Sequence, residues 1–303
     1  MLSNTHHVTV FGGTGFLGRN LVDRLVRQGY RVRVAVRNPR PDLFQDTDNR
    51  VEQVQTDVRN PQSVTDAIKH ADGVVNAVGL YVESRGATFE AVHVAGAQCV
   101  AQQSVISGAK LVYISGIGAD TESASAYIRA RAVGEQRVRE AAPHAVILRP
   151  SVLFGRNDAF LGSLSVMVRM LPVIPLFGNG ATRLQPVYVE DVAKAIETIF
   201  SGNEPGANIY ELGGAQILTY RDLLSTIVRQ LDRKRLMLPV PFAIWQLLAA
   251  LLSVLPNPPL TRDQIELMRH DNIVDPDVAG FAELGIEPCG LEDLLAMCLD
   301  QKE

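Results

Sequence analysis

The chain has 303 residues, 47% hydrophobic and 20% charged, a length that allows one large hydrophobic core or a large and a small one. Its formal net charge of -4 provides no overall attraction for phosphate backbones, so nucleic acid is not expected as a partner. Cys99, Cys289 and Cys298 show no CxxC spacing and are too few for a disulfide framework or a zinc site, which favours a reducing compartment.

Two further features narrow the class of protein. The first seven residues are polar and run directly into a predicted strand, without the apolar stretch of a signal peptide or the amphipathic helix of a transit segment. We therefore expect a cytoplasmic protein. The six histidines show no HxH or HxxxH spacing, so no metal site is expected.

Between His7 and about Arg149, short β-branched runs alternate with helix-length segments, which is the pattern of βαβ units on a parallel sheet. The predicted strands are Val8–Phe11, Val32–Val36, Val51–Gln55, Gly73–Ala77, Leu111–Ile114 and Val146–Arg149. The expected fold class is α/β, a Rossmann-type doubly wound parallel sheet.

Helix signals fall between these strands. One helical face of the first connection carries the apolar residues Leu17, Leu21, Leu25 and Val26. Gly29 is placed to end that helix as its C′ residue. Asn60 and Pro61 form an N-cap and N1 pair that opens a short helix through His70.

The second half of the chain is expected to have shorter and less regular secondary-structure elements, because ten prolines from position 150 to position 259 interrupt it. We expect a dinucleotide-binding domain at 1–150 and a smaller α+β lobe at 151–303, with segments that return to the main domain. Helices are predicted near Val189–Phe200 and Tyr220–Leu231, and Glu190 and Asp191 would charge the first turn of the former.

The first predicted strand leads into a glycine-rich turn and then into the amphipathic helix. Residues without a Cβ let the backbone approach a pyrophosphate, and the helix start presents free N–H groups with a partial positive charge. Strand, glycines and helix in this order indicate a dinucleotide site, whereas the alternative is a glycine-rich turn without a ligand. The predicted binding residues are Gly12, Gly13, Thr14, Gly15, Phe16, Leu17 and Gly18.

The end of the second predicted strand indicates which dinucleotide is bound. An acidic residue there would accept hydrogen bonds from the adenosine ribose and select NAD. This chain has Arg37 instead, nineteen positions after Gly18. A guanidinium can pair with a 2′-phosphate, so NADP(H) is preferred over NAD(H); the alternative is a solvated surface arginine.

The GxxGxxG spacing resembles the extended and atypical short-chain dehydrogenase/reductases of the NAD-dependent epimerase/dehydratase type. Further landmarks extend the resemblance over most of the chain: TDV at 56–58, VVNAVG at 74–79, YISGIGA at 113–119, LRPSVLFG at 148–155, PVYVEDVA at 186–193 and YELGG at 210–214. The resemblance implies that Asp57 and Val58 flank the adenine. It also implies that Asn76, Ala77, Val78 and Pro150 line the cofactor, although Asn76 could equally be a turn residue that closes a strand.

In the same family, a Tyr in a YxxxK pair donates the proton during hydride transfer, and a Ser assists it. The resemblance assigns these roles to Ser115 and Tyr127, but the lysine position holds Arg131. Residues four apart share a helix face, so the cation can lower the pKa of the phenol. Arginine keeps the charge but stays protonated and presents a broad fork, which puts proton relay and ribose contacts in doubt. The alternatives are an amphipathic-helix role for Tyr127 and a backbone partner for Ser115.

A narrower resemblance involves SAYIRARAVGEQRVRE at 125–140, together with LRPSVLFG and RLQPVYVEDVA at 183–193. These stretches are similar to the NADPH-binding accessory subunit of respiratory complex I and its bacterial relatives. That resemblance implies NADPH held structurally, with respiratory complex I or a quinone-related enzyme as partner. Unlike the mitochondrial members, this chain is expected to have no transit segment.

One segment of the second lobe is unusually apolar. Phe242–Leu255 reads FAIWQLLAALLSVL, which is too short to span a bilayer. It could lie in a membrane interface or a partner groove, with Trp245 at the boundary; the alternative is a buried helix that covers the substrate cleft.

The leading hypothesis is an NADPH-binding protein of this type with a structural or regulatory cofactor, associated with complex I or quinone metabolism, cytoplasmic or peripheral on the inner membrane. The alternative is an active NAD(P)H-dependent reductase or epimerase that acts on a small carbonyl or nucleotide-sugar substrate, with Tyr127 as acid and base.

Overall fold

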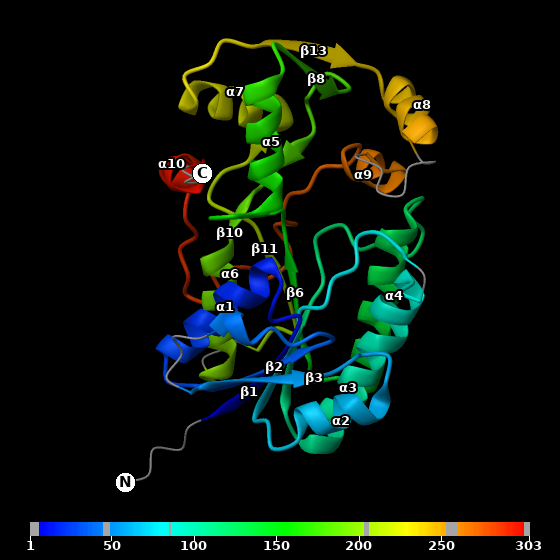
Figure 1. Ribbon diagram of the computed structural model, residues 1–303, viewed down its shortest axis with the longest axis vertical. Helices are drawn as coiled ribbons and strands as arrows, with labels where there is room; N and C mark the ends of the chain where they lie inside the picture. The colour runs from blue at the N-terminus through cyan, green and yellow to red at the C-terminus, as the bar shows by residue number, and fades with distance from the viewer. Residues whose placement is uncertain (1–5, 45–48, 85, 203–205, 253–259, 300–303) are drawn as a thin grey trace.

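The computed structural model describes residues 6–44, 49–84, 86–202, 206–252 and 260–299 (Figure 1). A seven-stranded sheet in the order β11-β6-β5-β4-β1-β2-β3 forms its centre, and every neighbouring pair is parallel. Its strands are β1 His7–Phe11, β2 Arg31–Val36, β3 Val51–Gln55, β4 Gly73–Asn76, β5 Lys110–Ile114, β6 Val146–Pro150 and β11 Ile209–Leu212. The α/β class is confirmed, and the six predicted strands are found with ends that differ by at most one residue.

Helices cover both faces of this sheet. One face carries α1 Phe16–Arg27 and α6 Val189–Phe200, and the other carries α2 Pro61–Ile68, α3 Ala97–Ser107 and α4 Ala126–Ala141. A π-helical turn, η2 Glu90–Gly96, leads into α3, and a 3-10 turn, η1 Pro41–Phe44, follows β2. Successive strand residues alternate between the two cores, as Val10 and Phe11 do, because side chains of a strand point to opposite faces.

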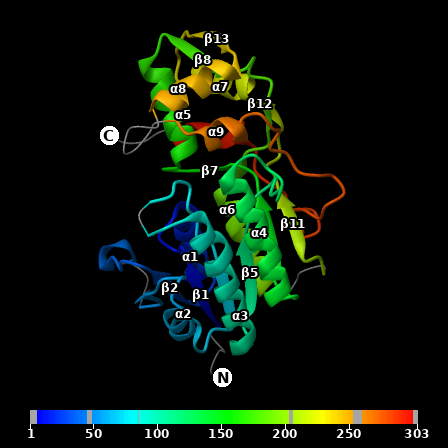
Figure 2. The same cartoon turned by 90° about the vertical axis from the view of Figure 1, so that its right-hand side faces the viewer.

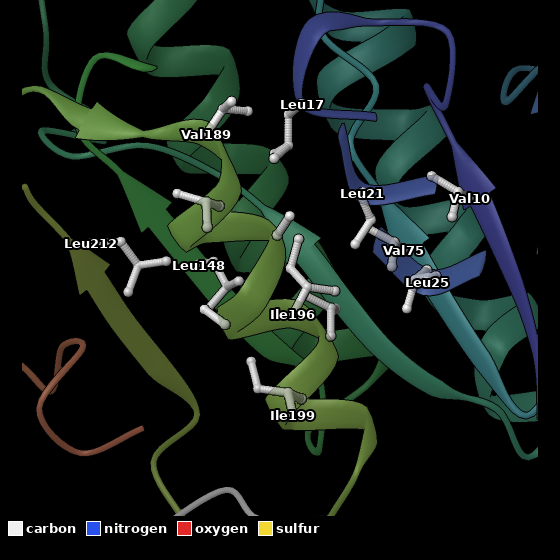
Figure 3. Close-up of a cluster of buried hydrophobic side chains, with 14 of the residues drawn as sticks. Val10, Leu17, Leu21, Leu25, Val75, Leu148, Val189, Ile196, Ile199 and Leu212 are labelled. Atoms are coloured by element: carbon white, nitrogen blue, oxygen red, sulfur yellow. The ribbon is translucent and has the colours of Figure 1, made fainter. Parts of the chain in front are cut away.

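The apolar stripe of α1 lies in the core between the sheet and α6. Leu17, Leu21 and Leu25 are buried against Ile196 and Ile199 of α6 (Figure 3). Each buried leucine contributes on the order of 2 kcal/mol through loss of apolar surface from water. This core fixes α1, and therefore the glycine turn before it, against the sheet.

The predicted helix ends are largely found. After α1, Gly29 adopts φ 91°, and the N–H groups of Gly29 and Tyr30 donate to the carbonyls of Val26 and Leu25, which confirms the C′ glycine. Asn60 caps α2 by accepting from the N–H groups of Gln62 and Ser63, as predicted. The helix ends at Ile68, earlier than expected, because His70 turns into the left-handed region at φ 63°.

The second lobe combines helices and short strands above the sheet in both views (Figures 1 and 2). Its core is built around α5 Ala159–Met170, α7 Tyr220–Gln230 and α10 Leu291–Leu299. The remaining elements are the strand pairs β7 Leu153–Phe154 with β10 Val187–Tyr188, β9 Arg183–Leu184 with β12 Leu218–Thr219, and β8 Val173–Phe177 with β13 Leu236–Val240, and the helices α8 Phe242–Leu252 and α9 Arg262–Leu267. The predicted helices at 189–200 and 220–231 correspond to α6 and α7, the latter one residue shorter.

Segments late in the sequence pack on the first lobe. Strand β11 extends the central sheet, and its Glu211 N–H donates to the Ala279 carbonyl at 2.8 Å. Asp191 lies in the first turn of α6, as expected, but its buried carboxylate also accepts the Cys289 N–H at 2.7 Å. These contacts join the two halves of the chain, while the boundary at residue 150 stays a prediction.

A buried ion cluster reinforces the same junction. The guanidinium of Arg149 in β6 bridges the carboxylates of Glu135 in α4 and Glu211 in β11, with N–O distances of 2.5 and 3.3 Å. The Glu211 carboxylate also accepts the Asp275 N–H at 2.8 Å. Because both carboxylates are almost fully buried, removal of the arginine would leave two unpaired charges in the interior.

Candidate dinucleotide site and reaction centre

The glycine turn is packed so closely that larger residues would not fit. Gly12 has φ 79°, and a Cβ placed on it would lie 2.5 Å from the carbonyl oxygen of Ala77 at the end of β4. A Cβ on Gly18 would overlap the carbonyl oxygen of Gly12, and one on Gly13 would lie 2.7 Å from Val34 of β2. These glycines therefore seat the first turn of α1 directly on the edge of the sheet.

Gly15 has a different role, because it is exposed and forms the N-cap of α1. Its N–H donates to Gly12 O at 2.9 Å, and no side chain caps the first turn of α1, which also lacks an acidic residue. The amides at this helix start are oriented for an anion, as a pyrophosphate requires. The side chain of Leu17 belongs to the core, and the partly buried ring of Phe16 lies near Gly155.

Arg37 lies exposed at the carboxyl end of β2, on a surface cavity of about 630 Å³. Asp57 lines the same cavity but is paired with Arg59, whose Nε donates to the carboxylate at 2.8 Å. This hydrogen bond and the Arg59 charge hold the pKa of Asp57 below its usual value, with a smaller contribution from Arg37. Sequence reasoning missed Arg59, although it lies two residues after Asp57 in the TDVR stretch.

The other residues assigned to the cofactor follow neighbouring strands. Val58 is buried and packs against Gly96, so its side chain supports the loop. Asn76 is buried, and its side-chain oxygen accepts the Val78 N–H at 3.2 Å, which is the turn-closing role weighed as the alternative. Pro150 ends β6, and its carbonyl accepts the Ile117 N–H at 3.2 Å.

Of the three residues assigned to catalysis, Tyr127 and Arg131 are in contact, and Ser115 directly follows β5. Tyr127 and Arg131 lie one turn apart on α4, and Nη1 of Arg131 donates to the Tyr127 hydroxyl at 2.7 Å. The Arg131 guanidinium lies against Gly116, where a Cβ would clash with it, and Ser115 is the preceding residue. The Ser115 hydroxyl is buried, and among the described residues it has no hydrogen-bond partner.

The surroundings of Tyr127 keep its phenol protonated. Burial raises the pKa of Tyr127, and the charge of Arg131 opposes this without reversing it. The rings of Tyr81, Phe89 and His93 surround it at centroid distances of 5.5, 5.7 and 5.6 Å. Sequence reasoning did not identify these three residues, because they come from the β4 loop and η2, which approach α4 only in the fold.

His93, a member of this aromatic group, is also buried. Its Nε2 atom lies 2.9 Å from the carbonyl oxygen of Leu80. Burial lowers the pKa of His93, so its ring is neutral at physiological pH. Close approach of α4 to η2 holds this arrangement, since a Cβ on Gly134 would overlap the His93 carbonyl.

These residues fit a nicotinamide dinucleotide. The glycine turn and uncapped helix start suit a diphosphate, and Arg37 lines a polar cavity at the β2 end. The Ser115 hydroxyl, without a partner among the described residues, follows β5 one residue before the glycine that contacts Arg131, at the end of the sheet where ligands of such folds bind. Within the described ranges no His, Cys, Asp or Glu side chains gather as metal ligands would, and no helix is long and apolar enough to cross a membrane.

Comparison with known proteins agrees with this geometry. Residues 8–213 match the model of the NAD dependent epimerase/dehydratase family. The mitochondrial NADH-ubiquinone oxidoreductase 40 kDa subunit of Neurospora crassa is 32% identical over 292 residues, which cover 94% of this chain and 76% of that protein. A ceramide reductase of Caulobacter vibrioides is 33% identical over 187 residues, or 61% of this chain and 58% of that protein.

The fold is also found among solved structures. The UDP-glucose 4-epimerase of Thermus thermophilus, solved as a complex with NAD, superposes with a TM-score of 0.67 at 18% identity, covering 97% of this chain and 98% of that chain. The family match spans the glycine turn, Arg37, Ser115, Tyr127 and β11. With its dinucleotide-binding fold, this chain belongs to the NAD dependent epimerase/dehydratase family.

Proposed function

We propose that this protein binds NADPH in preference to NADH and holds it as a structural or regulatory cofactor, in association with respiratory complex I or quinone metabolism. The observation that carries the proposal is the Arg131–Tyr127 pair, in which arginine replaces the lysine of the family's reaction centre and Tyr127 is buried and protonated. Arginine cannot give up its proton, so this site is suited to holding a nicotinamide and poorly suited to relaying protons.

Preference for the 2′-phosphate rests on Arg37. Arg37 is exposed on the cavity at the β2 end, and Asp57, which lines the same cavity, is already engaged by Arg59. Arg37→Asp should weaken NADPH far more than NADH in calorimetric titrations, because it exchanges an attractive charge for a repulsive one. Arg139→Asp, at an exposed position on α4, is the matched control; equal losses for both dinucleotides would contradict a 2′-phosphate contact.

Structural binding predicts that the cofactor stays with the protein. Native mass spectrometry of the purified protein should show a retained NADPH, and Tyr127→Phe should keep it. Recovery of the protein without any dinucleotide, together with no heat on titration of NADPH or NADH, would contradict a resident cofactor.

The partner is proposed from the relatives. The similar Neurospora protein is named as a subunit of NADH-ubiquinone oxidoreductase, and the same kind of assembly is proposed here. We place the protein in the cytoplasm, peripheral on the inner membrane, with a contact through Phe242–Leu255, of which residues 253–255 lie outside the described ranges. Comigration with membrane NADH-quinone oxidoreductase activity on native gels would support this assembly, and its absence from that band would contradict it.

A second function is favoured by the unpartnered Ser115 hydroxyl and by the similarity to a ceramide reductase. A bound NADPH would supply a hydride, while Tyr127 would give a proton to the carbonyl oxygen and Ser115 would orient that oxygen. In this case Tyr127→Phe abolishes turnover and Arg131→Lys preserves or raises it. Unchanged turnover in Tyr127→Phe would remove this tyrosine from the mechanism.

A further inference from the structure

Helix α8 presents an apolar stripe to solvent. Ile244, Leu247, Leu248 and Leu251 follow the i, i+3, i+4, i+7 spacing that ordinarily packs a helix onto a core. All four are exposed, Leu247 by 61% and Leu251 by 64%, and Ala249 is the one fully buried residue of the helix. The expectation of a buried helix over a substrate cleft is therefore not met.

The stripe of α8 is exposed although the opposite side of the helix is fixed to the lobe. The indole Nε1 of Trp245 donates to the Leu176 carbonyl at 3.1 Å, and its ring lies 4.5 Å from that of Phe177. At the start of the same helix, the Phe242 ring lies 4.9 Å from the guanidinium of Arg269. Trp245 thus holds α8 to the lobe, and its expected place at a membrane boundary stays a prediction.

Further exposed apolar residues lie on neighbouring elements of the lobe. Leu236 and Leu238 lie on the outward face of β13, and Leu236 is 65% exposed. Leu236 pairs with Val173 of β8, and Met170 at the end of α5 is 74% exposed. α8, β13, β8 and the end of α5 lie at the end of the molecule remote from the seven-stranded sheet in both views (Figures 1 and 2). We call this surface the lobe tip.

Basic side chains accompany the lobe tip, although the whole chain is acidic. Arg233 and Lys234 are exposed in the short turn that precedes β13, and Arg169 is exposed one residue before Met170. The guanidinium of Arg235 donates to the carbonyls of Val168 and Arg169, which ties this basic segment to the end of α5. From residue 229 to residue 252 the sequence has four basic residues and a single acid, Asp232.

We propose that the lobe tip docks onto an anionic lipid bilayer, with the stripe of α8 and the outer face of β13 in the interface and the basic residues at the headgroups. Apolar surface flanked by Lys and Arg matches the chemistry of such a membrane, whereas a protein groove for an apolar helix need not be acidic. The proposal deepens the membrane location proposed above and gives it a surface and a lipid class.

Vesicle cosedimentation tests the apolar part. The full-length protein should sediment with vesicles of phosphatidylcholine and phosphatidylglycerol, and Leu247→Ser/Leu251→Ser should lower the apparent affinity at least about tenfold. Val105→Ser/Ile106→Ser, an exposed apolar pair on α3 in the other lobe, is the matched control and should sediment like the unchanged protein. Equal sedimentation of all three proteins would overturn the proposal.

Charge is tested with the same assay. Arg233→Glu/Lys234→Glu should weaken binding to anionic vesicles by at least about fivefold for each basic residue lost, and raised salt should do the same. Arg139→Glu/Lys194→Glu, on exposed helix positions of the first lobe, should have little effect. Equally strong binding to pure phosphatidylcholine would overturn the anionic lipid class.

Two controls separate other outcomes. Dimers in analytical ultracentrifugation that Leu247→Ser/Leu251→Ser dissociates would identify a second copy as the occupant and would overturn lipid docking. Calorimetric titration of NADPH without vesicles should be unchanged in the lobe-tip variants. If the unchanged protein binds NADPH but not lipid vesicles, the lobe-tip proposal fails and the proposed function stands. If the unchanged protein does not bind NADPH, the proposed function fails, whatever its binding to lipid.

Discussion

Helices α1 and α8 carry the same kind of apolar stripe and lie in opposite surroundings. In α1, Leu17, Leu21 and Leu25 are buried between the sheet and α6, whereas in α8 the leucines at 247, 248 and 251 face solvent. An apolar stripe requires a cover, but its periodicity does not say whether the chain itself supplies it. In the first lobe the sheet of the same chain buries the apolar faces of the helices. At the lobe tip we propose that a lipid bilayer buries the stripe of α8.

The largest expected effect tests this contrast directly. Leu21→Ala should lower the free energy of unfolding by about 3 kcal/mol, because it leaves a cavity in a closed core. Leu247→Ala should change it by less than about 0.5 kcal/mol. Denaturant unfolding of both variants measures the difference, and similar losses would mean that α8 is covered in solution.

The inner side of α8 should behave like a core. Trp245→Ala should destabilise the docking of α8 by about 2 kcal/mol, because the contact with Phe177 and the hydrogen bond to Leu176 are both lost. Hydrogen exchange of the α8 amides measures this locally, with Leu248→Ala as the control on the same helix. Unchanged protection in Trp245→Ala would show that the anchor lies elsewhere.

Substitution of a glycine in the turn should lower both the free energy of unfolding and the affinity for a dinucleotide, whereas substitution of a glycine elsewhere should lower only the former. Gly18→Ala should cost about 2 kcal/mol, because its Cβ would overlap backbone atoms of Gly12 and Gly13, and Gly108→Ala about 1 kcal/mol, through a left-handed backbone with no neighbour within reach. Only Gly18→Ala should weaken dinucleotide binding, at least about tenfold by calorimetry, because it displaces the helix start. Equal affinities for the two variants would place the diphosphate elsewhere.

A smaller effect concerns pH. The folded-state pKa of His93 lies below its ordinary value, so the unfolded chain binds a proton more readily and stability falls as pH drops below about 6.5. His93→Gln should flatten this part of the stability profile. Urea unfolding between pH 7 and pH 5 measures it, with the exposed His270→Gln as control; an unaltered slope in His93→Gln would mean that this ring is not the group responsible.

The central sheet could be predicted because β-branched runs bounded by turn residues leave little choice of strand position. The seventh strand was not expected, since β11 is four residues long and joins the sheet only through its pairing with β6. Arg59, the partner of Asp57, was missed for a different reason, because it lies only two residues further along and no pattern marked it as a partner. The aromatic group around Tyr127 was also missed, because its members belong to separate segments.

Local sequence alone specified the dinucleotide turn, the cap residues Gly29 and Asn60, and the one-turn spacing of Tyr127 and Arg131. Each of these depends on backbone conformation or on neighbours within a few residues, which is why single residues could identify them. Tertiary packing decided that Ser115 finds no partner in the described part of the chain, that Trp245 turns inward and that the stripe of α8 faces outward. Burial depends on which distant surfaces meet, and no periodicity within one helix carries that information.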